Sequence, residues 1–199
     1  MTSIIKYCRL LLIILPISNA LFVENASSQR PVFLSADSEN IEILPVQENI
    51  YMIATGGSNI AVMIGELGLI VVDSGNTEAS ENVVNAISEL SSLPPRYLIN
   101  TAALPTHLEG NLAIHGIGEA LPGTQATAGG MGMPIVGHAN GLSILVTEFS
   151  DEIPYEIWPN STFFGENKAL YLNGEPIDIM HIPAAITQSD VLVHFRRSD

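Results

Sequence analysis

The chain has 199 residues, of which 47% are apolar and 14% are charged, a composition typical of a folded domain with a buried core. Seven lysine and arginine residues stand against 21 aspartate and glutamate residues, which gives a net charge of -14 at pH 7. This charge disfavours binding to nucleic acid and to anionic membrane surfaces. The single cysteine, Cys8, excludes an intrachain disulfide and a cysteine-rich zinc module.

Residues 1–20 have the pattern of a secretory signal peptide. Lys6 and Arg9 form a short basic region, residues 10–17 are mostly apolar, and Ser18 and Ala20 supply the small residues of a cleavage site. The apolar run is short for a membrane helix, so we expect no stable span after cleavage, with an uncleaved anchor as the alternative. The sequence predicts a secreted or periplasmic protein, with a flexible leader over residues 21–40 and a domain over residues 41–199.

The domain is predicted to begin with four strands, at residues 41–44, 50–54, 60–64 and 69–72. The last two segments are apolar without alternation, which is typical of strands buried on both faces. A helix is expected after Gly75, capped by Asn76 or Thr77, with a buried stripe formed by Val83, Val84, Ile87 and Leu90. A strand at residues 97–99 follows Pro94-Pro95, and this order predicts a parallel pair joined by a crossover helix.

The second half of the domain has weaker signals. Residues 120–134 are glycine-rich and predicted to be irregular, and residues 138–146 are consistent with a helix. Residues 169–172 and 177–181 flank Asn173-Gly174, a dipeptide typical of a β-hairpin turn. A last strand is expected over residues 190–195.

Several of these segments, in this order, resemble the metallo-β-lactamase superfamily. Residues 49–53, 58–62 and 69–75 are similar to its opening hairpins and aspartate-containing loop, and residues 97–101 are similar to the strand that delivers its zinc-binding loop. Residues 134–140 and 182–190 are similar to later segments, and residues 158–174 and 195–199 suggest a secreted hydrolase-like branch. The resemblance implies an α+β fold, an αββα sandwich of two facing sheets with helices outside, whose second half is incomplete in this chain.

Intact members hold one or two zinc ions, which lower the pKa of a bound water so that it attacks as hydroxide. The family's first metal loop reads Asn-Thr-His-x-His-x-Asp-His-x-Gly-Gly-Asn, and residues 100–111 match its frame at Asn100, Thr101, Gly110 and Asn111. The resemblance places Ala102 and Leu104 at two histidine positions and Thr106 at the aspartate position, so that only His107 is retained.

The segment that aligns with the family's second metal loop departs from the family pattern in the same way. The family pattern Pro-Ala-x-His-Thr-Asp-Gly-Asp aligns with residues 183–190, where Ile186 stands at the histidine position and Asp190 is retained. Hydrocarbon side chains cannot donate a lone pair to zinc, and one imidazole binds it weakly. We therefore expect no metal and no other cofactor, and a former active-site cleft lined by Ala102, Leu104, Thr106, His107 and Ile186, with Asp73 and Asp190 nearby.

Three functions remain open from the sequence. The first is a non-catalytic, metal-free relative that binds a small molecule or a protein in this cleft, which its apolar replacements would make drier. The alternative is a zinc-dependent hydrolase of lactams, esters, lactones or thioesters, with ligands from elsewhere; a pairing of His107 with His181 gives two at most. The third is a truncated or decaying product that exposes a sheet edge and an apolar face.

Other chemistry has little support in the sequence. There is no Gly-x-Ser-x-Gly nucleophile motif, no phosphate-binding Walker loop, and no cysteine after residue 20. Asp73, His107 and Asp190 together suggest acid–base chemistry only if they converge in space. The other histidines have structural interpretations: His115 as a surface residue, His138 as a local hydrogen-bonding group, and His194 on a strand face.

Overall fold

The computed structural model describes residues 41–123 and 132–198. The predicted signal peptide and leader, and residues 124–131 of the glycine-rich segment, lie outside the described residues. Of the helices in the described part of the chain, none has the length and apolar character that a membrane crossing requires.

Seven strands form the larger of two sheets, in the order of the sequence. The first four pair antiparallel, and the pairs from the fourth to the seventh are parallel. The prediction of a parallel pair around a crossover helix is therefore confirmed. The strands are β1 (Glu42–Gln47), β2 (Ile50–Ala54), β3 (Asn59–Met63), β4 (Leu69–Val72), β5 (Pro95–Ile99), β6 (Ile135–His138) and β7 (Ser161–Phe163).

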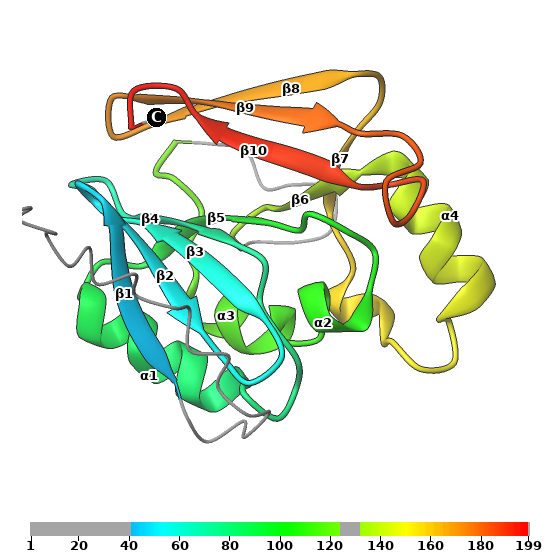
Figure 1. Ribbon diagram of the computed structural model, residues 1–199, viewed down its shortest axis with the longest axis horizontal. Coiled ribbons are helices and arrows are strands. Elements are labelled where there is room, and N and C mark those ends of the chain that lie inside the picture. The colour runs from blue at the N-terminus through cyan, green and yellow to red at the C-terminus, as the bar shows by residue number, and fades with distance from the viewer. Residues whose placement is uncertain (1–40, 124–131, 199) are drawn as a thin grey trace, which may run out of the picture. The chain divides into compact units, whose positions relative to one another are not determined.

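A second sheet of three antiparallel strands faces the larger one (Figure 1). Its strands are β8 (Asn167–Leu172), β9 (Glu175–His181) and β10 (Val191–Phe195), in the order β10-β9-β8. Asn173 and Gly174, between β8 and β9, have φ angles of 55° and 80°. Positive φ at both central residues is the requirement of a type I′ turn, so the predicted hairpin is confirmed.

The packing of β4 explains why apolar and polar residues do not alternate along its sequence. All four of its residues are buried. Leu69 and Val71 face a cluster shared with the helix α1 (Ser80–Leu90), whereas Ile70 and Val72 face a cluster shared with β9 and β10. The strand is thus covered on one face by helix and on the other by sheet, and two-sided burial leaves no position for a polar residue.

The helix α1 starts later than the sequence predicts. Asn76 and Thr77 do not cap it, because Asn76 accepts a hydrogen bond from the backbone N–H of Ala79 in a turn before the helix, 3.0 Å away. The first helical residue is Ser80, and the N-cap position, Ala79, has no side-chain cap. Within the predicted stripe, Val83 and Ile87 are buried and Val84 is only half-buried, because the buried face runs through Ala86 instead.

The remaining helices of the described residues are shorter than α1 (Figure 1). They are α2 (Pro105–Leu108), α3 (Asn111–Ile117), α4 (Ala139–Glu148) and the 3₁₀ turn η1 (Tyr155–Ile157). Leu108, Leu145 and Ile157 pack with Ala103 in a third apolar cluster. This cluster fixes the loop after β5 against α4, so that the backbone of residues 100–111 has a packed support.

Candidate functional site

The candidate site lies where the parallel strands β4, β5 and β6 end. Asp73 follows β4, Asn100 and Thr101 follow β5, and His138 is the last residue of β6. The loop between β9 and β10 reaches the same edge, since the N–H of Val191 donates to the carbonyl oxygen of Thr101 over 2.8 Å. The carboxyl edge of parallel strands is where α/β proteins gather functional loops.

Asp73 is the centre of the hydrogen bonding at this edge. Its side chain is nearly enclosed, and its carboxylate accepts from the N–H of Thr101 at 2.7 Å, from the hydroxyl of Thr101 at 2.6 Å, and from Nδ1 of His107 at 2.9 Å. The residue has a φ of 63°, a left-handed conformation that aspartate tolerates better than most residues. The structure therefore brings together Asp73 and His107, as acid–base chemistry would require.

The matching frame residues of the first loop are held by a buried amide pair. Asn100 and Asn111 exchange two hydrogen bonds, of 2.9 and 2.8 Å, and both are buried. Asn100 also donates to the carbonyl oxygen of His107 at 3.0 Å, and Asn111 donates to that of Ile157 at 2.6 Å. These bonds satisfy polar groups that would otherwise be buried without partners.

The residues that the resemblance places at ligand positions differ widely in exposure. Ala102 is buried and lines a cavity of about 10 Å³ together with His138 and Ser189, whereas Ile186 is 81% exposed. Leu104 is half-buried at the start of α2, and Thr106 is exposed. A joint ligand cleft formed by these residues stays a prediction.

Asp190 has partners of its own in the β9–β10 loop. Its carboxylate accepts from the backbone N–H groups of Ile186 and Thr187 and from the hydroxyl of Thr187. Burial raises the pKa of Asp190, but these hydrogen bonds and the charge of His107 outweigh burial and leave the pKa below its ordinary value. Asp190 is therefore ionised, and its carboxylate stabilises its own loop through these hydrogen bonds.

His107 stands at the one histidine position of the first loop that the resemblance predicts to be retained. The hydrogen bond to Asp73 raises its pKa above 6.5, burial opposes this increase, and the charges of Asp73 and Asp190 add to it. A protonated imidazole is a poor metal ligand, because the coordinating nitrogen must give up its proton. Within residues 41–123 and 132–198, no three histidine, cysteine, aspartate or glutamate side chains are grouped closely enough to hold a metal ion.

The remaining histidines include one contact that the sequence does not predict. His115 is half-buried in α3, and His194 lies on β10. His138 and His181, which end strands of different sheets, stack with their ring centroids 3.6 Å apart. Their separation of 43 positions in the chain carries no pairing signal.

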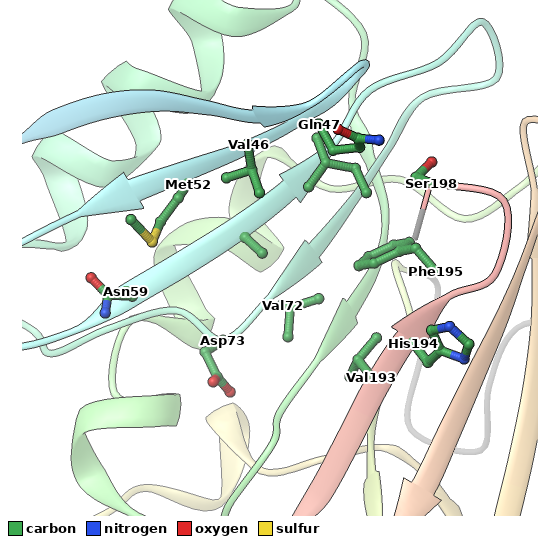
Figure 2. Close-up of a pocket in the computed structure, with 12 residues that line it drawn as sticks. Val46, Gln47, Met52, Asn59, Val72, Asp73, Val193, His194, Phe195 and Ser198 are labelled. Carbon is green, nitrogen blue, oxygen red and sulfur yellow. The ribbon is translucent and has the colours of Figure 1, made fainter. Parts of the chain in front are cut away.

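A groove of about 400 Å³ lies between the two sheets and reaches Asp73 at one end (Figure 2). Its floor comes from the first strands of the larger sheet, and one wall comes from β10. Figure 2 shows the side chains of Val193 and Phe195 directed from β10 toward these strands. The lining is mostly apolar and includes Val46, Ile50, Met52, Ala61, Val72, Val193 and Phe195, with Asn59 and His194 among its polar members.

Comparisons with known proteins establish the fold. No family model matches the chain, and no curated protein matches it. Among solved structures, a metallo-β-lactamase from Pontibacter korlensis superposes with a TM-score of 0.60 at 13% identity, over 79% of this chain and 68% of that one. A metallo-β-lactamase from Cronobacter sakazakii, solved as a mutant, gives a TM-score of 0.62 at 12% identity, over 80% of this chain and 62% of that one.

A third similar structure belongs to an enzyme with a different name. The stereoselective inverting sec-alkylsulfatase from a Pseudomonas species gives a TM-score of 0.62 at 12% identity, over 79% of this chain and 30% of that one. The chain thus spans between 30% and 68% of the length of these three proteins. At such low identity the similarity shows the fold alone, and it confirms the predicted metallo-β-lactamase-like α+β fold with two facing sheets.

Proposed function

We propose that this protein is a secreted, metal-free and non-catalytic relative of the metallo-β-lactamase-fold hydrolases, and that it binds an apolar small molecule in the groove between its sheets. The observation that carries the proposal is the chemistry of the first loop. Its frame is held by Asn100 and Asn111, while Ala102 and Leu104 offer no lone pair at the ligand positions.

The polar groups that remain at the loop support a structural role. The carboxylate of Asp73 has three hydrogen-bond donors inside the protein, and the carboxylate of Asp190 has three in its own loop. A carboxylate with several internal donors is stabilised in place and is a weak candidate for binding a cation, since binding would break those bonds. The hydrogen bonds of Asp73 and Asp190 therefore support a role in holding the two loops.

The groove supports binding of an apolar molecule. Its volume of about 400 Å³ falls within the range of small-molecule sites, and apolar walls with a few polar groups are typical of such sites. Asn59 and Asp73 lie at one end of this lining and Ser198 lies elsewhere in it, so an elongated molecule with a polar end fits its composition.

A substitution that fills the groove tests this proposal. Ala61 lies on β3 and lines the groove, so Ala61→Phe places a phenyl ring in the space that the ligand needs. We expect the uncharged fluorescent probe N-phenyl-1-naphthylamine to bind the unaltered protein saturably. Its affinity for Ala61→Phe should be at least about tenfold lower, a loss of about 1.4 kcal/mol in binding free energy. The measurement is a fluorescence titration.

The matched control is Ala169→Phe. Ala169 is exposed on β8, outside the groove, and the substitution adds the same ring to a strand. Its affinity for the probe should equal that of the unaltered protein. Equal affinity in Ala61→Phe, or equal loss in both variants, would show that the probe binds elsewhere.

A further inference from the structure

His138 and His181 join the two sheets at the edge that carries the functional loops. His138 ends β6 of the larger sheet, and His181 ends β9 of the smaller one. Their rings are nearly parallel, at 7°, with centroids 3.6 Å apart, and Phe163 of β7 meets the ring of His138 edge-on at 5.1 Å. The pair is thus enclosed on one side by an aromatic ring, and each histidine is the other's direct neighbour.

The hydrogen bonds of His138 determine which ring nitrogen carries the proton when the imidazole is neutral. Its Nδ1 accepts from the backbone N–H of Asn140 at 3.3 Å, which caps α4, so this nitrogen carries no proton. Its Nε2 then carries the proton and donates to the carbonyl oxygen of Gly165 at 3.2 Å. A second proton has to go to Nδ1, and it removes the acceptor of the helix cap.

His181 is the second ring of the stack. Its Nε2 donates to the carbonyl oxygen of Gln188 at 2.9 Å, and the side-chain amide of Asn140 donates to the same oxygen at 2.9 Å. The loop between β9 and β10 is therefore bonded to the start of α4 through Asn140 and to the end of β9 through His181. The stack connects the helix cap and this loop in one unit.

We propose that the stacked pair His138 and His181 is a pH-dependent latch, which fastens the β9–β10 loop to α4 at neutral pH and releases it in acid. Protonation of both rings places two like charges within stacking distance, and protonation of His138 also ends its bond to Asn140. Separation of the rings relieves the repulsion, and it carries the loop with Asp190 away from α4.

The charged groups around the pair do not offset this repulsion by direct bonds. Glu166 follows Gly165 in the β7–β8 connection, and its backbone oxygen accepts from the N–H of His181. Asp190 directs its carboxylate to Ile186 and Thr187, and His107 pairs with Asp73. Across the described ranges, no carboxylate is hydrogen-bonded to either stacked ring. α4 has its only acidic residue, Glu148, at the far end.

The pKa of His138 has the direction that a latch requires. Burial lowers it below 6.5, the charge of His181 lowers it further, and the carbonyl of Gly165 opposes both. Because the unfolded chain takes up the proton at a higher pH than the folded chain does, the contribution of neutral His138 is present above pH 6.5. It is lost as the pH falls through the folded-state value.

Hydrogen–deuterium exchange of the full chain tests the latch. After correction for the intrinsic pH dependence of exchange, amides of residues 182–190 should lose protection roughly tenfold for each pH unit below the midpoint of His138. His181→Phe removes the hydrogen bond to Gln188 and the second charge but keeps His138, so protection should be lower at neutral pH and should fall less steeply in acid than in the unaltered protein. His115→Gln, which removes a histidine outside the latch, should behave like the unaltered protein.

A second measurement uses the unaltered protein alone and does not depend on a variant that folds. The ring signals of His138 in a proton–carbon correlation spectrum should titrate below the ordinary histidine value of about 6.5, together with the loss of loop protection. Equal protection of the loop at pH 7.5 and pH 5.0, or a midpoint of His138 at or above the ordinary value, would overturn the proposal.

Discussion

Replacing Asp73 with alanine is expected to lower the free energy of unfolding by about 3 kcal/mol. The substitution leaves the N–H and hydroxyl of Thr101 and Nδ1 of His107 without their acceptor in a nearly enclosed site. It also places alanine at a φ of 63°, where its Cβ is strained. Urea denaturation followed by circular dichroism measures the change.

Asp73→Asn separates these contributions. Asparagine adopts left-handed conformations readily and keeps one acceptor oxygen, so the loss should be only about 1 kcal/mol. If neither substitution lowers the free energy of unfolding, the carboxylate is not the centre of the loop's hydrogen bonding, and the structural role assigned to this residue is wrong.

Gly110→Ala should be comparably damaging, with an expected loss of about 3 kcal/mol. A Cβ at this position would overlap the backbone oxygen of Ser74 and lie 3.1 Å from its carbonyl carbon. Backbone atoms cannot rotate away as a side chain can, and Gly110 also donates its N–H to the oxygen of Gly75. The contact between the two loops must therefore open, which calorimetric or denaturant unfolding will record.

Gly116→Ala is the matched control for this change. Gly116 lies in α3, six positions further along the chain, and a Cβ there meets no atom within 4 Å. Alanine favours helix over glycine by up to about 1 kcal/mol, so this variant should be as stable as the unaltered protein or more stable. A large loss in Gly116→Ala, or none in Gly110→Ala, would contradict the tight approach of the two loops.

The elements with strong local signals are those that the sequence predicts well. The apolar run of β4 requires cover on both faces, and Asn173-Gly174 requires a tight turn, so both follow from a few neighbouring residues. The start of α1 is predicted wrongly because Asn76 serves a turn as readily as a helix cap. The short strand β7 has no such signal, since three residues carry too little periodicity.

The candidate site is predictable only where the resemblance fixes a position. The proximity of Asp73 and His107 follows from that frame, and the structure shows their bond. The different environments of Ala102 and Ile186 depend on how two distant loops pack, which neither residue type determines. The stack of His138 on His181 forms because the two sheets face each other. Only the three-dimensional structure reveals it, since the two residues are far apart in the sequence.

The central claim concerns the metal, and zinc titration of the purified, untagged protein tests it most directly. Isothermal calorimetry should record no saturable one-to-one binding by the unaltered chain. The variant carrying Ala102→His, Leu104→His, Thr106→Asp and Ile186→His should gain uptake, because the missing donors are restored. Tight binding of one zinc ion per unaltered chain, abolished by His107→Ala, would contradict the account.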